Sequence, residues 1–485
     1  MSDSRPPIPR SHRMTRGRPT GAWRVRGSAL ILCLLPAFVS PVPAAEPDSA
    51  MQRPVDSTTG SRLTNGSFLG YETAVRIGLE QHPLVKRSKQ SALAAGAVTE
   101  IAESRYYPEL NAYAIQTGGT IRPGSAFNIS GAQNKPTSYV ESVGVRADQL
   151  LYDFGQTAHR IMAERAGQEA TEKDILTSKA LVILRVQQEY IRCVQQQRLV
   201  RIVEEMVRQR GILRDQIDTF YKRELRSKLD LNLIAVELRN AEVQLLQAKN
   251  ELRASFAGLN NAMGIRGADE YTLEETASIA MPTAGLDALV RQAMNHRPEV
   301  LGSADRIRQA QEQLNSAQAL NLPTISALGM YGVIHFSDAP TNQYVGSHPG
   351  QTNLWWGAGA TLSVPIFTGF LIESRVAEAK QQRYTAEQRK EELSNRITLE
   401  VSESYFALQT AQQQIKVEEK EVEFSRSALD LARERYRIGL ASIVDITTAT
   451  TALLMAEVRL AESRYAVQAG ATALSYAVGD AYRQF

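Results

Sequence analysis

The sequence contains few residues of the kind that form covalent cross-links. Among its 485 residues there are two cysteines, Cys33 and Cys193. Cys33 lies in an N-terminal segment that we expect to be removed, so the mature chain would keep one thiol and no intramolecular disulfide. Cys193 lies seven residues after Val186 and seven before Val200, a spacing typical of packed helix positions. We therefore expect a buried structural thiol there and no nucleophile.

The residues and motifs of common active sites are also missing. The five histidines beyond the N-terminal segment are scattered and form no pair with metal-ligand spacing; they are His82, His159, His296, His335 and His348. There is no HExxH, GxxxxGKS/T or GxSxG motif. The glycine-rich stretch from Thr117 to Gly131 is better explained as a loop between strands than as a phosphate loop. We expect no catalytic, cofactor or metal site, and a protein that is not an enzyme.

Long apolar runs are absent except near the N-terminus. The run from Ala29 to Val39 is too short for a helix that spans a membrane, which needs about 20 residues. A leader with seven arginines precedes it, and small residues follow it. This pattern predicts a secretory signal peptide over residues 1–45, cleaved after Ala44 or Ala45.

Two features of the leader bear on processing. Translation could begin at Met1 or at Met14. Cys33 could carry a lipid only if small residues preceded it, and Ile31 and Leu32 do not fit a lipoprotein signal. We therefore expect cleavage without lipidation.

The basic character of the whole chain comes from this leader. Removing it lowers the number of basic residues from 55 to 48 and of acidic residues from 52 to 51. The mature chain then gives no reason to expect nucleic-acid binding. No mature segment reaches 18 uninterrupted apolar residues, so the exported chain either stays soluble or enters a membrane as β-strands.

What the sequence does contain is a long internal repeat. A constant shift that places Tyr71 on Leu286 aligns residues 71–264 with residues 286–479 without a gap, so that Pro83 matches Pro298. A repeat of about 200 residues is a duplicated domain and not a short solenoid unit. The predicted parts are a signal peptide (1–45), a flexible segment (46–66), a first repeat (67–264), a connection (265–285), a second repeat (286–479) and a C-terminal tail (480–485).

Each repeat contains alternating stretches that predict a β-hairpin with one apolar face. The strands are expected over about 109–150 and about 324–365, with loops over 117–137 and 334–353 between them. The apolar face, which we expect to contact lipid, carries Val143, Val145, Ala358 and Ala360. An arginine at Gly144 or Thr361, on the other face, should be tolerated better than one at Val143 or Ala358. Tyr139 and Trp355-Trp356, near strand ends, would fit an interfacial girdle or an ordinary aromatic patch.

Helical stretches flank the hairpins. Residues 68–107, before the first hairpin, are expected to be helical with an interruption at Pro83. The stretch from Asp153 to Thr219, after it, contains no proline, and about 65 helical residues would extend nearly 100 Å.

In the matching long stretch of the second repeat, apolar residues recur every seven positions in two series. The first series is Val401, Leu408, Ile415, Val422, Leu429 and Tyr436, and the second is Val417, Phe424, Leu431 and Ile438. The series lie about 200° apart around the helix, so we expect neighbours on both sides, as in a ring of helices.

Each pair of long helices is expected to meet in a tight tip. In the second repeat, over about 436–445, Gly439 can end one helix in a left-handed conformation and Ser442 can cap the next. Asp445 lies in the first turn of that next helix, where the helix dipole favours a carboxylate. The first-repeat tip spans about 221–230, and its matching residues are Glu224, Ser227 and Asp230.

Together these features resemble the TolC family of bacterial outer-membrane export channels. Besides the duplicated helix–hairpin–helix plan, three short motifs carry the resemblance. They are Leu151-Tyr152-Asp153-Phe154-Gly155, Pro365-Ile366-Phe367-Thr368-Gly369, and Arg435-Tyr436-Arg437-Ile438-Gly439-Leu440-Ala441-Ser442 with Asp445. Each motif is moderately specific, but their order, spacing and duplication over residues 68–480 make the resemblance strong.

The resemblance implies a mainly helical chain with membrane β-strands that assembles as a homotrimer. Each subunit would give four strands to a shared 12-stranded β-barrel in the outer membrane, and the long hairpins would form an α-barrel across the periplasm. An inner-membrane ABC transporter and a periplasmic adaptor would dock at the tips. Independently of the resemblance, four strands are too few to close a barrel, so several chains must share one.

The resemblance also implies a periplasmic gate at the tips. The gate candidates are Asp445, Asp230, Tyr436 and Arg437, and the adaptor-docking candidates are Gly439, Leu440, Ser442, Leu225 and Ser227. The chain departs from the family pattern at Ala441, where an arginine helps to latch the closed tip, at Thr448, where a second aspartate would lie, and at Glu224, which replaces a glycine. We therefore expect Tyr436 and Arg437 to reach the other hairpin and Asp445 to form a single acidic ring. A simple helix-capping role for Asp445 is the alternative.

The cargo is defined less sharply by the sequence. The missing lipoprotein cysteine and the Leu151–Gly155 motif resemble the type I protein-secretion branch, which includes exporters of repeat-rich adenylate cyclase–haemolysin toxins. One alternative is the outer-membrane component of a multidrug or small-molecule efflux pump. A periplasmic coiled-coil structural protein is an alternative from another class, and the alternating strands argue against it.

Overall fold

The computed structural model describes residues 66–119, 138–274, 284–337 and 352–483. The expected signal peptide with Ala44 and Ala45, nearly all of the 46–66 segment, and most of the two hairpin loops lie outside these ranges. Within them the chain is mainly helical, with strands gathered in one four-stranded and one two-stranded sheet.

The helices follow the same order in both repeats. The first repeat contains α1 (Tyr71–Gln81), α2 (Pro83–Glu103), α3 (Gln156–Lys222) and α4 (Lys228–Met263). The second contains α5 (Leu286–His296), α6 (Pro298–Ala319), α7 (Leu371–Arg437) and α8 (Ile443–Val478). The two long helices α3 and α7 have 67 residues each and begin at matching positions of the two repeats. Short 3-10 turns follow α2 (η2, Ser104–Tyr106) and α8 (η3, Ala481–Arg483).

Proline separates the two short helices of each repeat. Pro83 and Pro298 are the first residues of α2 and α6, where a missing N–H leaves no helical hydrogen bond unmade. The residues before them, His82 and Arg297, have extended backbone, which a following proline favours. The chain therefore changes direction at these points without losing its helical character.

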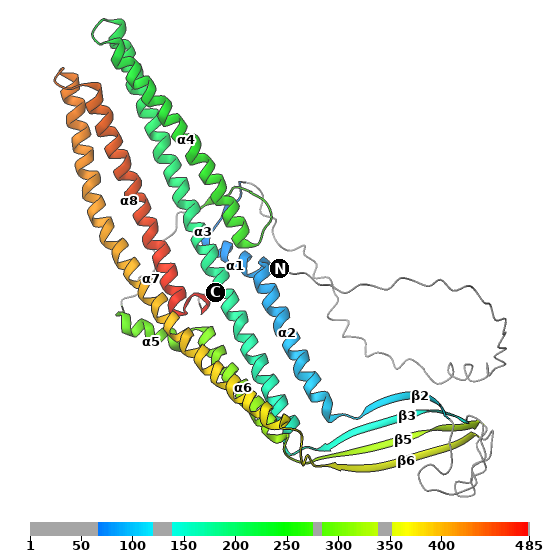
Figure 1. Cartoon of the computed structure of the whole chain (residues 1–485). Helices are drawn as coiled ribbons and strands as arrows, with labels where there is room; N and C mark the ends of the chain where they lie inside the picture. The colour runs from blue at the N-terminus through cyan, green and yellow to red at the C-terminus, as the bar shows by residue number, and fades with distance from the viewer. Residues whose placement is uncertain (1–65, 120–137, 275–283, 338–351, 484–485) are drawn as a thin grey trace, which may run out of the picture. The chain divides into compact units, whose positions relative to one another are not determined.

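The four-stranded sheet contains both hairpins side by side. Its strands are β2 (Glu109–Gly119), β3 (Ser138–Tyr152), β5 (Thr324–Ser337) and β6 (Thr352–Ser363), in the order β2-β3-β5-β6 with antiparallel pairing throughout. The strands are longer than expected, because residues 117–119, 334–337 and 352–353 belong to the ladder and not to loops. The sheet lies at the end of the long helices opposite to the tips (Figure 1).

The register of the sheet places the expected lipid-facing residues on one side. Val145 pairs with Tyr331, which pairs with Trp356, two residues before Ala358. Val143 pairs with Val333 in the next row of the same face. Because side chains alternate along a strand, Val143, Val145, Ala358 and Ala360 share a face to which both hairpins contribute.

The expected tolerance of a side chain at Gly144 is wrong. Gly144 pairs with Gly332, and the two backbones approach closely. A Cβ atom on Gly144 would lie 2.6 Å from the carbonyl oxygen of Tyr331 and 2.9 Å from the Cα of Gly332. No side chain fits there, whichever face it points to.

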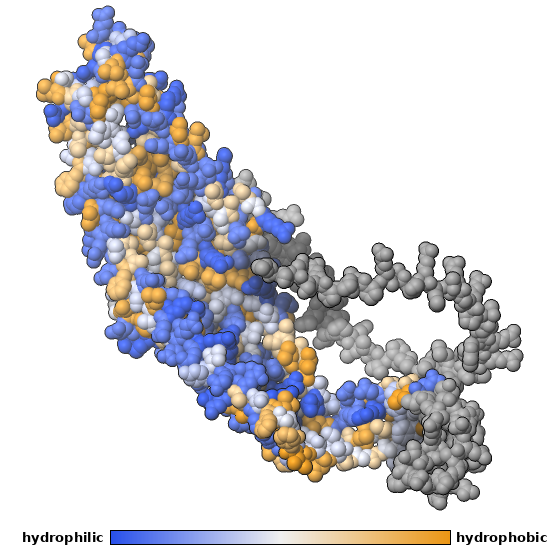
Figure 2. Space-filling view, viewed as in Figure 1, coloured by the Kyte–Doolittle hydropathy of each residue, from blue (hydrophilic) through white to orange (hydrophobic). Residues whose placement is uncertain are grey.

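The turns from strand to long helix use left-handed backbone in both repeats. Phe154 and Gly155 have φ angles of 53° and 97°, and their counterparts Gly369 and Phe370 have 63° and 64°. The order of phenylalanine and glycine is thus reversed between the repeats while the backbone is kept. Both phenylalanines are exposed, and hydrophobic side chains gather near this junction (Figure 2).

The long helices form a layer whose order follows from their contacts. α3 packs along α4 and, more sparsely, along α8, and α8 packs along α7. The order across the layer is therefore α4-α3-α8-α7, with α4 and α7 at the edges (Figure 1). One apolar core lies where α5, α7 and α8 meet, and a second lies near the tips, where Ile217 and Ile234 pack with Leu429, Ile443 and Ile446.

The two apolar series of α7 have different environments within one chain. In the first series Val401, Leu408, Leu429 and Tyr436 are buried. In the second series Val417, Phe424, Leu431 and Ile438 are 60–70% exposed. Other helices of the same chain thus cover the first series, and the second series remains exposed as an apolar seam along α7.

Two segments outside the long helices are held in place by specific contacts. Phe68–Leu69 (β1) was expected to be helical, but it pairs in parallel with Thr272–Leu273 (β4), and the buried Tyr190 hydroxyl donates to the Leu69 carbonyl at 3.0 Å. The C-terminal tail is also held in place. Gln292 donates to Asp480 at 2.7 Å, and the Tyr482 hydroxyl donates to the His296 carbonyl at 3.0 Å.

Across the described ranges, no helix combines the length and the apolar character that crossing a membrane would require.

Candidate functional site at the helical tips

The tip of the second repeat is built by a left-handed glycine and a capping box. Gly439 has a φ of 79°, and the Leu440 N–H returns to the Arg435 carbonyl at 2.8 Å, which closes the end of α7. Ser442 caps α8 by accepting from the Asp445 N–H at 3.3 Å, while Asp445 accepts from the Ser442 N–H at 2.7 Å. The Ser442 N–H, together with the Ser442 hydroxyl, which donates to the same carboxylate at 3.0 Å, lowers the pKa of Asp445, with a smaller contribution from Arg435.

The tip of the first repeat has the same shape with different residues. Glu224 takes the left-handed conformation of Gly439, with a φ of 58°. A bulky residue rarely adopts this conformation, so the tip keeps its shape despite a small cost. Ser227 accepts from the Asp230 N–H at 3.1 Å, but only the second-repeat cap has the reciprocal bond.

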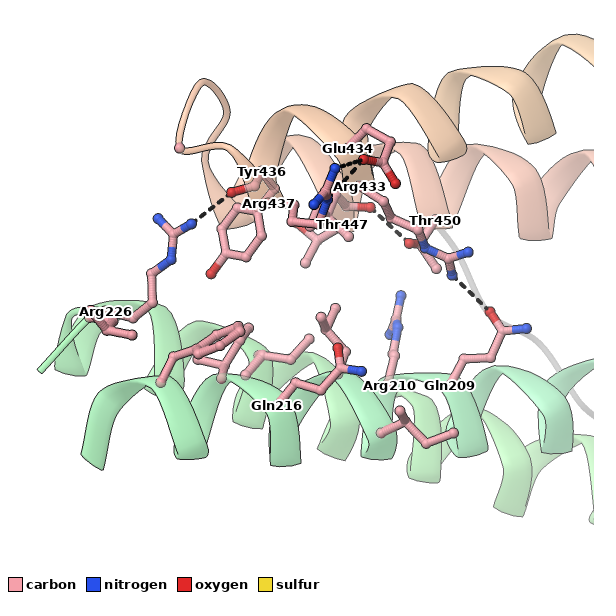
Figure 3. A pocket seen from close by; sticks show the side chains of 18 of the residues that line it. Gln209, Arg210, Gln216, Arg226, Arg433, Glu434, Tyr436, Arg437, Thr447 and Thr450 are labelled. Atoms are coloured by element: carbon pink, nitrogen blue, oxygen red, sulfur yellow. Dashed lines mark hydrogen bonds and ion pairs between the residues drawn. The ribbon is translucent and has the colours of Figure 1, made fainter. Parts of the chain in front are cut away.

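The two tips are joined by Arg226 and Tyr436. The Arg226 guanidinium carbon lies 4.1 Å from the centre of the Tyr436 ring, and its Nη2 donates to the Tyr436 carbonyl at 2.7 Å (Figure 3). Sequence reasoning singled out Tyr436 but missed Arg226. A signal was available, because the shift that aligns the two repeats places Arg226 on Ala441 and makes it the first-repeat counterpart. The arginine absent from position 441 has an equivalent on the other hairpin.

Arg437 does not make the contact that we expected of it. Its guanidinium pairs with Glu434, one turn earlier on α7, at 2.9 Å. Residues three apart on a helix surface are neighbours and pair locally. The Arg437 guanidinium is therefore held against α7 and does not extend to the first hairpin. Tyr436 therefore contacts the first hairpin, and Arg437 remains with its own helix.

A second link between the hairpins lies deeper, at Arg210 of α3. Its side chain is buried, pairs with Glu237 of α4 at 3.1 Å and donates to the Thr451 hydroxyl of α8 at 3.3 Å. Burial lowers its pKa, and Glu237 opposes that shift. Arg210 thus fixes three helices to one another, a role that the sequence did not reveal.

The expected docking residues lie on the outer surface of the tips. Leu225 and Leu440 are large apolar side chains left exposed at the two turns. Gly439, Ser442 and Ser227 lie beside them and are exposed as well. Exposed apolar residues at the end of an otherwise charged helical layer are a feature of contact surfaces. Among the described residues, no group of three or more His, Cys, Asp or Glu side chains could hold a metal ion.

Known proteins share the sequence pattern and the fold of this chain. The sequence model of the outer membrane efflux protein family matches residues 75–265 and 289–480. The chain is 28% identical over 203 residues to outer membrane protein TolC of Salmonella enteritidis, a match that covers 41% of this chain and 40% of that relative. It therefore spans less than half the length of that relative.

Two further proteins match over most of their length. The chain is 21% identical over 425 residues to the cation efflux system protein CusC of Escherichia coli O157:H7, covering 85% of this chain and 86% of that relative. The solved structure of the Campylobacter jejuni CmeC outer membrane channel superposes with a TM-score of 0.71 and 18% identity, covering 85% of this chain and 86% of that chain. This structural likeness shows the same fold.

Proposed function

Because this chain belongs to the outer membrane efflux protein family, as its sequence motifs predicted, we propose that three copies of it form the outer-membrane channel of a tripartite exporter. The protein is located in the outer membrane, with its long helices in the periplasm. Its substrates would pass through the space enclosed by the three copies, without any chemical change.

The observation that carries this proposal is a pair of exposed apolar seams at the two edges of the helical layer. α7 exposes the second series from Val417 to Ile438, and α4 exposes Leu229, Val236 and Val243 with the same seven-residue spacing. Uncovered heptad seams on opposite edges fit each other when copies are arranged head to tail. Such contacts close into a ring when the rotation between copies divides a full turn.

The sheet supports the same arrangement. Its outer strands β2 and β6 each have one edge without a partner among the described strands. Exposed strand edges are prone to pair with another chain. Three copies joined through β2 and β6 would bring these edges together and turn the apolar face, with Val143, Val145, Ala358 and Ala360, toward lipid.

At the other end, the tips would provide the gate and the docking surface. Arg226 on Tyr436 holds the two hairpins of one copy together, so separating them requires this contact to break. Asp445 lies exposed in the first turn of α8, where three copies around an axis would bring three carboxylates close and attract cations. Leu225, Ser227, Gly439, Leu440 and Ser442 would contact a periplasmic adaptor.

For the cargo, we propose type I secretion of a protein, with an ABC transporter in the inner membrane. The support is the sequence pattern of residues 151–155 and the missing lipoprotein cysteine. The second candidate is export of small solutes or metal ions, and the support for it is the similarity over 425 residues to a protein named for cation efflux.

Deleting the gene separates these candidates. Loss of a secreted protein from the culture medium, with unchanged resistance to toxic solutes, supports type I secretion. Loss of resistance with an unchanged set of secreted proteins supports efflux. If the protein fractionates with the periplasm and neither property changes, a coiled-coil structural role replaces both.

A further inference from the structure

A cavity of about 1000 Å³ lies between the two hairpins, just inside their tips (Figure 3). Its walls come from α3, α7 and α8, with Ile234 of α4 and the first-repeat turn. Much of the lining is apolar, from Leu213, Ile217, Phe220 and Ile446. A concave, mainly apolar site of this size can bury a small organic molecule.

The charged lining of the cavity is predominantly positive. Arg210, Arg226, Arg433 and Arg437 contribute to it, and Glu434 is the one acidic residue among its lining residues. Arg210 and Arg437 are neutralised by Glu237 and Glu434. Arg226 bonds to a carbonyl and an aromatic ring, and Arg433 lies 3.8 Å from Asp430 and 3.4 Å from the amide oxygen of Gln209. Arg226 and Arg433 therefore keep donors for an anion.

One polar group in this lining has no partner. Tyr436 is 6% exposed, and its hydroxyl makes no hydrogen bond with any described residue. The ring lies between the hairpins, and the hydroxyl points toward the first hairpin (Figure 3). Burial raises the pKa of this hydroxyl, so it remains a donor at neutral pH. A buried donor without an acceptor is unfavourable, and an acceptor oxygen in the cavity would satisfy it.

We propose that this cavity binds an amphiphilic organic anion. Its acidic head accepts from the Tyr436 hydroxyl and lies in the positive field of Arg226 and Arg433, and its apolar body covers Leu213, Ile217 and Phe220. Because such a ligand contacts both hairpins, it stabilises their arrangement as seen here and opposes their separation. The binding step itself does not depend on what the protein exports.

The test is calorimetric titration of the full-length protein in lipid nanodiscs, with empty nanodiscs as the blank. The probes are 2-naphthalenesulfonate and 2-naphthylmethylammonium, which share one apolar body and carry opposite charges. We expect the sulfonate to bind at one site per chain and at least about tenfold more tightly than the ammonium ion.

Two variants test the residues that hold the head group. Tyr436→Phe removes only the hydroxyl and keeps the ring and the carbonyl that Arg226 contacts. We expect it to weaken sulfonate binding about fivefold, the effect of one hydrogen bond. Arg433→Gln should have a similar or larger effect. The matched control is Arg435→Gln, a nearby arginine on α7 that does not line the cavity, and its affinity should stay within about twofold of the unaltered protein.

Equal affinity for the two naphthalene ions would overturn the proposal. So would unchanged sulfonate affinity in both Tyr436→Phe and Arg433→Gln when circular dichroism shows that these variants are folded.

Discussion

Arg226 occupies in the first repeat the position that Ala441 occupies in the second, and this exchange decides how the two hairpins are linked. A guanidinium at 441 would begin on the second hairpin and reach for the first. At 226 it begins on the first hairpin and contacts the ring and the carbonyl of Tyr436. The link between the hairpins is therefore kept, but the arginine that makes it belongs to the first hairpin and not to the second.

We predict that Arg226→Ala weakens the closed arrangement of the tips. The change removes a cation–π contact and a charged hydrogen bond, together worth about 1–2 kcal/mol. In single-channel recordings the open fraction should rise about fivefold or more. The control is Arg223→Ala, an exposed arginine of the same turn. Equal recordings from both variants would show that Arg226 does not hold the tips.

Asp445 can be tested through cation block. We predict that Asp445→Ala weakens the block of single-channel current by multivalent cations applied from the periplasmic side, and that Asp230→Ala does so less. The carboxylate of Asp445 lies at the exposed turn, where a ring of three would concentrate cations. Unchanged block in Asp445→Ala would remove this residue from the channel and leave it only the capping role seen at Ser442.

The pH dependence of this block follows from the pKa of Asp445. The capping hydrogen bonds favour the charged form and lower the pKa. The cap's contribution to stability is thus present at pH values above the ordinary aspartate pKa and is lost as the pH falls through the lowered value. We expect cation block to be constant from neutral pH to about pH 5. A loss of block within that interval would mean that repulsion within the ring outweighs the capping bonds.

At the scale of helices and strands, the apolar seams carry the most information about assembly. In α7 the second series is exposed within one chain, whereas the matching positions of α3 include the polar residues Gln209 and Gln216. The exposed face of α7, at the edge of the layer, is therefore apolar. The matching face of α3, inside the layer, is more polar. This difference fits a chain whose α7, but not its α3, meets another copy.

We predict that Phe424→Glu prevents assembly of the copies. It places a charge in the middle of the exposed seam, where burying it without a partner costs several kcal/mol. The matched control is Gln209→Glu, the same new residue at the counterpart position of the first repeat. Native mass spectrometry after extraction should find single chains for the first variant and the wild-type assembly for the second. If both variants assemble, the α7 seam is not an interface.

The strands allow a similar comparison on one element. Ala358→Arg puts a charge on the apolar face of β6 and should cost about 2–4 kcal/mol if that face meets lipid at mid-depth. Thr361→Arg, three residues along the same strand but on the other face, should be tolerated. The yield of protein inserted in the outer membrane is the measurement. Similar losses from both variants would contradict the assignment of the faces.

Most helices, strands and turns could be predicted from the sequence, because apolar periodicity and turn-forming residues are local signals. The alternation around Val145 indicated a strand with one apolar face, and Gly439 with Ser442 indicated a turn between helices. The pairing of β3 with β5 could not be predicted, because it joins strands from different repeats that carry no matching local signal. The partner of Arg437 was mistaken because a local pair with Glu434 competes with any longer reach. Arg226 was missed because its role depends on which hairpin faces it.

At the scale of the whole molecule, the proposed channel requires several chains to enclose one passage. A single chain leaves both edges of its helical layer and both edges of its larger sheet uncovered within the described residues. These edges lie at the same two sides of the chain, so one ring closure satisfies the helices and the strands together. In the proposed channel, export therefore depends on the assembly and not on one subunit alone.

Single-channel recording of the purified full-length protein in a planar lipid bilayer tests whether the assembled chains form a channel. We expect stable conductance steps that are small when the tips are closed and that increase in Arg226→Ala. Protein that inserts into the bilayer, remains folded and carries no current, in either form, would contradict an export channel.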